Sequence, residues 1–166
     1  MDKGTGKNEI EILGNKAIHF VLSHSYIVFL LSIILGIIFH NYYNIHILNG
    51  VTVPYIGLIV IILGTLLIYW AQSSSKSQDN KEIEEERNEK DFERGPYAYS
   101  RNPTHIGLTM VTLGLGLILN SFFIFVFVII ASLVTKLIFI RKEEKLLERK
   151  YGQKYLDYKK KVSTWI

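Results

Sequence analysis

The sequence predicts an all-α fold, a polytopic bundle of four transmembrane helices, from three observations. Residues 51–71 form a run of 21 without a charge, and residues 121–140 form a run of 20 in which Lys136 is the one charged side chain. About 20 apolar residues span a bilayer core roughly 30 Å thick. The other 33 of the 34 charged residues (19 basic and 15 acidic) fall in clusters outside these runs, which excludes a soluble globular fold. The runs also lack the period-two alternation of an outer-membrane barrel.

The four expected spans divide the chain into an anchoring part and a part that carries the chemistry. We expect the spans at about residues 18–40, 51–71, 103–119 and 121–140. The first is too long and too far into the chain for a cleaved signal peptide. Residues 1–71 would be an N-terminal tail and two spans that anchor the protein and wall a pocket. Residues 72–166 would comprise a cytoplasmic connector, a helical hairpin and a C-terminal segment.

Basic residues predict the orientation of the spans, because loops rich in Lys and Arg stay in the cytoplasm. Along the chain, the tails and connections hold three, none, six, none and nine basic residues. We therefore expect a multi-pass integral membrane protein with both termini and the connection at residues 72–102 in the cytoplasm.

The last two spans are joined by Asn120-Ser121 alone, which predicts a tight antiparallel hairpin packed along its length. Beyond the fourth span, an apolar stripe at helical spacing predicts an amphipathic C-terminal helix, which Gly152 would break or bend. This helix would lie either on the membrane surface or over the cytoplasmic mouth of the bundle. The stripe consists of Leu147, Tyr151, Tyr155, Tyr158, Val162 and Trp165.

Polar residues gather at the two cytoplasmic ends of this hairpin. Pro103 suits the first turn of a helix and Asn102 suits its cap, so the helix start beside Arg101 would attract an anion. Glu143 and Glu144 offer negative charge at the other end of the hairpin. The aromatic faces of two tyrosines, Tyr97 and Tyr99, would suit a cation. The alternative is that these residues are interfacial anchors and solvated charges.

Other side chains carry weaker signals. Lys136 would either extend to the cytoplasmic face or act in a pocket beside Thr135. The chain has no cysteine, which excludes a disulfide framework and a thiol nucleophile. The histidines lack metal-ligand spacing, so we expect no metal. The basic tail would favour lipid headgroups over nucleic acid as partners.

The ordered set of motifs resembles the superfamily of isoprenylcysteine carboxyl methyltransferases and phospholipid methyltransferases, integral membrane enzymes. That family has Gly-x-Tyr, then Arg-(His/Asn)-Pro-x-Tyr-x-Gly, Leu-Asn at the hairpin turn, Glu-Glu-x-x-Leu and a Tyr-rich basic segment. The resemblance covers roughly residues 82–166, half of the chain. The matching positions are Gly95, Tyr97, residues 101–107, Leu119, Asn120, Glu143, Glu144, Leu147, Tyr151, Gly152, Tyr155, Tyr158 and Val162.

The resemblance implies that residues 72–166 form a methyltransferase core with S-adenosylmethionine bound under the hairpin. The implied cofactor-binding residues are Glu89, Lys90, Asp91, Phe92, Tyr97, Arg101, Asn102, Pro103, Thr104, His105 and Glu143. The catalytic residues we expect are Arg141, toward the acceptor, and Glu144. If the acceptor is an amine, its proton would go to a base such as Glu143, Glu144 or His105. Two positions depart from the family pattern: Phe139 stands where a substrate-linked arginine is usual, which makes Arg141 the nearest candidate, and His105 stands where tyrosine is usual.

The implied function is methyl transfer to a lipidic or prenylated small-molecule acceptor that enters from the bilayer. Carboxyl O-methylation is slightly favoured over amine N-methylation. A carboxylate nucleophile needs no base, whereas an amine must lose a proton. One alternative is an NADPH-dependent membrane reductase of the sterol type, which would need more cations and a longer bundle. Another is a membrane scaffold without enzymatic activity.

Overall fold

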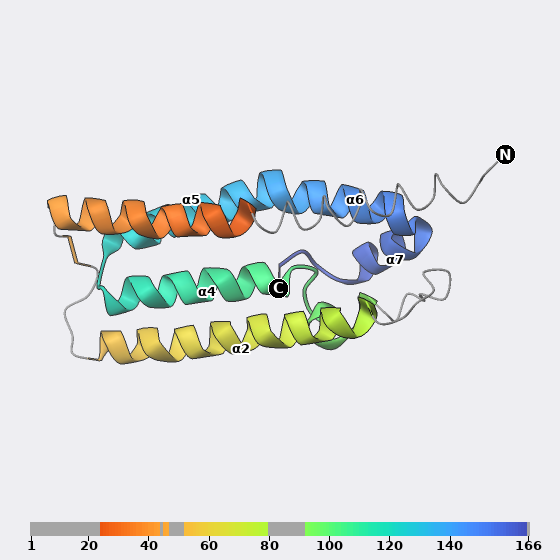
Figure 1. The fold of residues 1–166 in the computed structure, drawn as a ribbon, viewed down its shortest axis with the longest axis horizontal. Coiled ribbons are helices and arrows are strands. Elements are labelled where there is room, and N and C mark those ends of the chain that lie inside the picture. The colour runs from red at the N-terminus through yellow and green to blue at the C-terminus, as the bar shows by residue number, and fades with distance from the viewer. Residues whose placement is uncertain (1–23, 44, 47–51, 80–91, 166) are drawn as a thin grey trace.

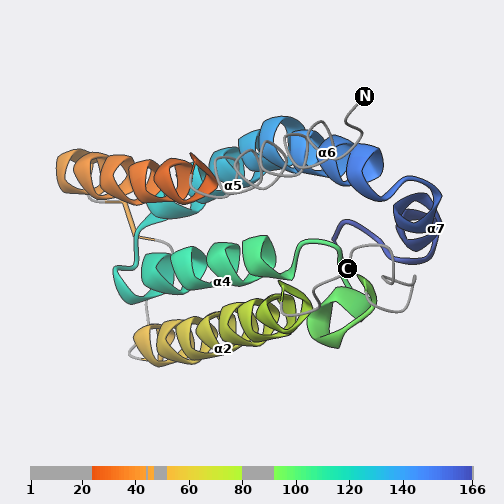
Figure 2. The same cartoon turned by 45° about the vertical axis from the view of Figure 1, so that its right-hand side comes forward.

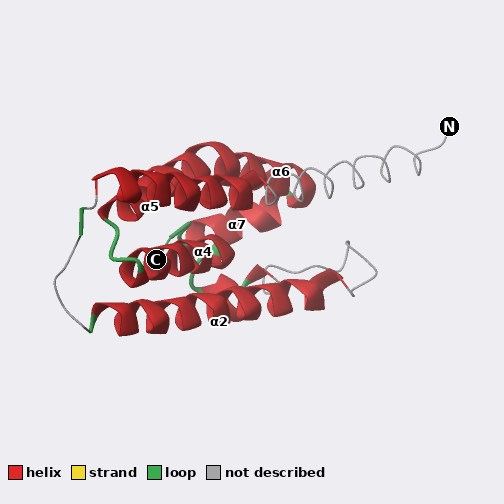
Figure 3. Ribbon diagram, turned by 60° about the vertical axis from the view of Figure 1, so that its left-hand side comes forward, coloured by secondary structure: helices red, strands yellow, loops and turns green. Residues whose placement is uncertain are grey.

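The computed structural model describes residues 24–43, 45–46, 52–79 and 92–165, and this part of the chain is built from helices, with no strand (Figure 3). The predicted all-α fold is therefore confirmed. In chain order the elements are a helix at His24–Tyr43, called helix 24–43 below, α2 (Val53–Asp79), the short 3-10 helix η2 (Gly95–Ala98), α4 (Pro103–Ile118), α5 (Phe122–Val134), the π-helical segment η3 (Thr135–Ile140), α6 (Arg141–Tyr151) and α7 (Gln153–Lys161).

Three of these helices are long and apolar enough to cross a membrane: His24–Tyr43, Val53–Ser75 and Phe122–Tyr151. They match the first, second and fourth expected spans. The third expected span is α4, a shorter apolar helix of 16 residues, which at 1.5 Å per residue is about 24 Å long. Large apolar side chains cover the outer face of α2, as expected for a lipid-facing helix. They include Ile56, Leu58, Ile59, Leu63 and Leu66.

The helices form two side-by-side pairs (Figures 1 and 2). One pair is α2 with α4, and the other is helix 24–43 with α5. The two pairs are close together where the turn joins α4 to α5. Toward the opposite end the α5–α6 helix lies farther from α4. This end, formed by η2, α6 and α7, is called the charged end below.

Close contact between backbones holds α4 against α2. A methyl group added at Gly57 would lie 2.6 Å from the carbonyl oxygen of Gly114, and one added at Gly64 would lie 2.8 Å from that of Gly107. Small residues permit such close approach of membrane helices. The hairpin differs from the expectation in this respect, because α4 packs along its length on α2 and contacts α5 far less.

The turn of the hairpin lies where the sequence predicts it. Asn120 adopts a positive φ of 47°, and the Ser121 hydroxyl accepts a hydrogen bond from the N–H of Ile124 at the start of α5. Near this turn Gly116 allows α4 to contact Ile124 and Phe125. On its other side α5 packs against helix 24–43, where Phe29 is buried.

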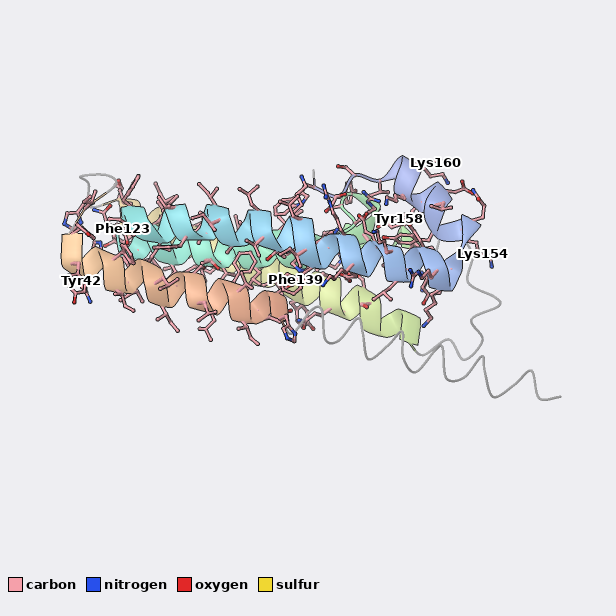
Figure 4. All side chains as sticks on the ribbon, turned by 90° about the horizontal axis from the view of Figure 1, so that it is seen from above. Tyr42, Phe123, Phe139, Lys154, Tyr158 and Lys160 are labelled. Atoms are coloured by element: carbon pink, nitrogen blue, oxygen red, sulfur yellow. The ribbon has the colours of Figure 1, made fainter. Side chains whose placement is uncertain are left out.

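The C-terminal segment folds back onto the charged end. Gly152, with a φ of 58°, separates α6 from α7, so the predicted break is confirmed. Tyr155, Tyr158 and Val162 are buried and pack with Phe92. Of the two placements considered for this stripe, the structure has the one over the end of the bundle. Figure 4 shows Tyr158 on the inner side of this segment, with Lys154 and Lys160 at its outer edge.

The polar segment after the second span begins as a helix. α2 continues to Asp79, and the acid-rich stretch at residues 80–91 lies outside the described residues. The described chain resumes at Phe92, and η2 then leads into α4. The start of α4 is thereby brought to the charged end, beside α6 and α7 (Figure 2).

Candidate functional site

A buried ion pair joins the residues that lead into α4 to α6 at the charged end. Arg101 Nη2 lies 3.2 Å from Glu144 Oε1, and the two side chains are 9% and 11% exposed. Glu144 Oε2 lies 3.0 Å from Lys159 Nζ of α7, which also contacts Glu148. Hydrogen bonds to Glu148 and Glu144 raise the pKa of Lys159 above its ordinary value. Both oxygens of Glu144 are therefore committed to cations.

Residues 163–165, called the C-terminal strap below, lie across the start of α4. The N–H of Arg101 donates to the carbonyl of Ser163 at 2.9 Å, and the Ser100 hydroxyl donates to the carbonyl of Thr164 at 3.0 Å. The Arg101 guanidinium also donates to the Thr164 hydroxyl. The strap ends at Trp165, whose ring centroid lies 5.9 Å from Lys136 Nζ. The C-terminal strap therefore covers the start of α4 and the Arg101–Glu144 ion pair at the charged end.

A π-helical turn sets which face of α6 points inward. The buried positions along α5, η3 and α6 follow steps of 4, 3, 4, 5 and 4, at Ile124, Val128, Ala131, Thr135, Ile140 and Glu144. An α-helix keeps one face buried with steps of three and four, and a five-residue step needs the extra residue of a π turn. η3 supplies this residue at Thr135–Ile140. As a result Glu144, rather than Glu143, continues the buried stripe and meets Arg101.

Buried polar atoms without a hydrogen-bond partner among the described residues are concentrated in the same region. In native proteins nearly all buried polar atoms are paired, so such a group calls for an explanation. Two further atoms of this kind lie outside the group, on His40 and on Glu93, the latter 3.6 Å from Lys161. The group itself comprises Arg101 Nε and Nη1, Asn102 Nδ2, His105 Nε2, Thr135 Oγ1, Glu143 Oε2 and Trp165 Nε1.

The start of α4 contributes donors to this group. Asn102 stands at the expected capping position, but its side chain makes no capping hydrogen bond. The N–H of Asn102 instead donates to the Ser100 hydroxyl at 3.2 Å. Pro103 opens the helix as expected. The first turn therefore presents its N–H groups and the amide of Asn102 without a side-chain partner from within the helix.

Tyr97 connects three elements at the site. Burial raises the pKa of its phenol, side-chain hydrogen bonds with Thr104 and Ser75 partly oppose the rise, and the charge of Glu143 adds to it. These interactions place the phenol between α2, α4 and α6. The carbonyl of Tyr97 accepts a hydrogen bond of 2.8 Å from the Tyr158 hydroxyl. Tyr99, by contrast, is 73% exposed.

On the side of the bilayer, a hydroxyl pair bounds the site. Thr109 Oγ1 of α4 lies 3.4 Å from Ser132 Oγ of α5. The unpartnered atoms of His105 and Thr135 lie one turn nearer the charged end than this pair. The site is thus a short polar region between α4 and the α5–α6 helix, bounded by Thr109 and Ser132 at one end and by the Arg101–Glu144 ion pair at the other.

Most of the residues predicted from sequence come together here. The ones that do are Tyr97, Arg101, Asn102, Pro103, Thr104, His105, Glu143 and Glu144. Two do not: Phe92 packs in the aromatic cluster with Tyr151, Tyr155 and Tyr158, and Arg141 is exposed. The three predicted residues Glu89, Lys90 and Asp91 lie outside the described residues.

Sequence reasoning did not assign three residues that the structure brings to the site: Thr135, Lys159 and Trp165. Thr135 stands next to the one charged residue of an apolar run, which is a weak signal. Trp165 belongs to the predicted stripe, and Lys159 to a run of three lysines with nothing to distinguish it. Their positions depend on the fold of the C-terminal segment and on the π turn.

Comparison with known proteins identifies one family. The family model described as phospholipid methyltransferase matches residues 53–154, from the start of α2 into α7. The match therefore includes α4, the π turn and both glutamates of the site. No curated protein and no solved structure matches the chain.

Proposed function

The chain belongs to the phospholipid methyltransferase family, and from this premise we propose that it transfers the methyl group of S-adenosylmethionine to a lipid-borne acceptor at the charged end of the bundle. It is a membrane methyltransferase, and its apolar helices are suited to reach acceptors within the bilayer. One observation carries the proposal: unpartnered buried polar atoms are concentrated between α4 and α6, where a polar ligand would satisfy them.

The residues of the site fit the cofactor chemically. S-adenosylmethionine supplies a methyl group on a positively charged sulfur, together with an amino-acid group, a ribose and an adenine. The unpartnered guanidinium nitrogens of Arg101, with the N–H groups at the start of α4, suit the carboxylate of the amino-acid group. Glu143 Oε2 suits an ammonium or a ribose hydroxyl. Asn102 and Tyr97 provide further hydrogen bonds beside them.

Glu144 has a different role in this proposal from the base suggested by the sequence. Its two oxygens contact Arg101 and Lys159, so it is a poor proton acceptor and a good positioning residue for Arg101. Arg141 is exposed, whereas the unpartnered atoms are buried. The residues that remain available to accept a proton are Glu143 and His105.

An amine is the acceptor that this arrangement supports best. An amine nucleophile must be neutral to attack, and Glu143 or His105 would accept its proton. The remaining contribution to the rate comes from holding the nucleophile in line with the methyl group. Carboxyl O-methylation is the second candidate. It is favoured by the free guanidinium nitrogens of Arg101, which would bind a carboxylate.

We further propose that the charged end faces the cytoplasm. Six basic residues lie between the second and third spans and nine follow the fourth, whereas the connections at the other end have none. This asymmetry is the pattern of cytoplasmic loops. The acceptor would then enter sideways from the bilayer, with its polar end at the cytoplasmic face.

The test is equilibrium binding to the purified protein in detergent micelles. We expect S-adenosylmethionine to bind with micromolar affinity by isothermal titration calorimetry and S-adenosylhomocysteine to compete with it. NADPH should give no heat, which separates this function from a reductase. Absence of binding and of any thermal shift with either adenosyl compound, on folded protein, would overturn the proposal and favour a scaffold.

The acceptor class is tested separately in proteoliposomes with radiolabelled S-adenosylmethionine. Dioleoylphosphatidylethanolamine is the amine probe, and N-acetyl-S-farnesylcysteine is the carboxylate probe. We expect label in the phospholipid. Label in the prenylcysteine alone would replace the amine with the second candidate.

A further inference from the structure

The hydroxyl of Thr135 differs from the other buried hydroxyls of the bundle. Thr135 is 1% exposed, and its Oγ1 has no hydrogen-bond partner among the described residues. Buried hydroxyls in helices normally donate to a carbonyl in the preceding turn. Thr109 does so to His105 at 2.9 Å, Thr112 to Leu108 at 2.8 Å, and Ser32 to Phe29 at 2.7 Å. The exception therefore needs a physical reason.

The backbone at Thr135 is also exceptional. The π turn begins at this residue, and the N–H of Thr135 is shared between the carbonyls of Ala131 and Ser132. π turns inside α-helices are frequent at functional sites, because the inserted residue changes where side chains point. Here Thr135 remains on the buried stripe of α5. The extra residue of the π turn then changes which face of α6 points inward.

The register of the helices brings Thr135 to the same level of the bundle as His105. Thr109 contacts Ser132, and one turn toward the charged end on each helix leads to His105 on α4 and Thr135 on η3. His105 is 4% exposed, and its Nε2 is also without a partner among the described residues. The two polar atoms are buried on facing helices and do not bond to each other.

We propose that Thr135 Oγ1, together with His105 Nε2, binds the reacting headgroup of the lipid-borne acceptor, an inference that rests on the proposed function. Both atoms lie between the Thr109–Ser132 pair and the ion pair of Arg101. Thr135 precedes Glu143 by eight residues, about 12 Å along a helix, and so lies nearer the bilayer. An acceptor that enters from the lipid meets Thr135 before it reaches the residues assigned to the cofactor.

The chemistry of the two groups suits an amine that must be held and then deprotonated. A threonine hydroxyl both donates and accepts, so it can accept a hydrogen bond from an amine N–H. The imidazole Nε2 can accept a second. Hydrogen bonds from the amine N–H groups to Thr135 and His105 would orient the nitrogen lone pair. Neither of these side chains carries a negative charge. Thr135 is therefore an acceptor-binding residue, and the cofactor contacts remain with Asn102, Arg101 and Glu143.

The matched variants are Thr135→Val, which keeps the shape and removes the hydroxyl, and Thr135→Ser, which keeps the hydroxyl. Thr112→Val is the control, because its hydroxyl is bonded within α4. In dioleoylphosphatidylethanolamine proteoliposomes, Thr135→Val should raise the KM for phospholipid about five- to tenfold, the loss of roughly one hydrogen bond. Thr135→Ser should recover most of this loss. The Kd for S-adenosylhomocysteine should stay within about twofold of the unmodified protein in all three variants.

Thermal unfolding without ligand gives a second readout. Thr135→Val should leave Tm unchanged or raise it, because it replaces an unpaired buried hydroxyl with a methyl group. Thr112→Val should lower Tm. An unchanged KM in Thr135→Val, or a fall in its Tm as large as that of Thr112→Val, would overturn the role of Thr135 in binding the acceptor. If the variants still bind S-adenosylhomocysteine, the proposed function stands in either case. Failure of the unmodified protein to bind S-adenosylhomocysteine would overturn both.

Discussion

At the scale of single residues, two adjacent glutamates have opposite environments. Glu144 is held between Arg101 and Lys159, whereas Glu143 Oε2 is buried and has no partner among the described residues. Their neighbour Lys142 is exposed. These differences predict that substitutions at the two glutamates affect different properties of the protein.

Glu143→Gln is expected to weaken cofactor binding with little effect on stability. The change keeps the size of the side chain and removes its charge, and a charge-assisted hydrogen bond is worth about 1.5–3 kcal/mol. The Kd for S-adenosylmethionine should therefore rise roughly tenfold to a hundredfold. Calorimetry on Glu143→Gln and on the control Lys142→Gln measures this. Equal affinities in the two variants would remove Glu143 from the site.

Glu144→Gln is the matched contrast, because it removes a charge from a buried ion pair. Breaking such a pair leaves Arg101 without its counter-charge, which costs about 3 kcal/mol of unfolding free energy. We expect a clear fall in Tm for Glu144→Gln and almost none for Glu143→Gln. A Tm equal to that of the unmodified protein would show that the ion pair does not stabilise the charged end.

At the scale of elements, the packing of α4 on α2 positions the start of α4. This packing depends on glycines that place the two backbones in contact. The other wall of the site, from α5 to α6, is one continuous helix whose face shifts at the π turn. A perturbation of either wall is therefore expected to move the residues of the site.

Gly107→Ala is expected to lower the free energy of unfolding by about 1–3 kcal/mol, the usual cost of overpacking. The added methyl group would lie 2.6 Å from Ile68 Cγ1 and 2.8 Å from the carbonyl oxygen of Gly64. Denaturation in detergent measures the effect. Leu66→Ala, on the exposed face of α2, is the control and should change stability much less. Similar losses in both variants would mean that the close packing of the glycines is not a major source of stability.

At the scale of the whole molecule, polarity is distributed unequally between the two ends of the bundle. The turn between α4 and α5 has no basic residue, while α6 and α7 have nine. The α5–α6 helix lies near α4 at the turn and moves away from it toward the charged end (Figure 2). The site therefore lies at the end that the basic residues predict to be cytoplasmic.

Single cysteines test this orientation, since the natural chain has none. Tyr42, at the end of helix 24–43 near the turn, is 84% exposed, and Ser73, in the last part of α2, is also exposed. A membrane-impermeant thiol reagent should label Tyr42→Cys from the outside of intact cells and Ser73→Cys only after the membrane is opened. Labelling of both from the same side would contradict the proposed topology.

The features that depend on local chemistry could be predicted from the amino-acid sequence alone. Apolar runs of about 20 residues indicate membrane helices whatever their neighbours are. The turn at Asn120-Ser121 and the break at Gly152 follow from short-range preferences, and both are present in the structure. The motifs around Arg101 and Glu143 were sufficient to indicate the family that the comparison identifies.

Which residues contact one another at the site depends on how the helices pack. The five-residue step from Thr135 to Ile140 cannot be read from a helical repeat of 3.6, so the sequence did not show that Glu144 would face Arg101. The preference of α4 for α2 depends on glycine contacts between segments some fifty residues apart. The unpartnered hydroxyl of Thr135 is likewise a property of the folded bundle, because burial and the absence of a partner exist only once the helices have packed.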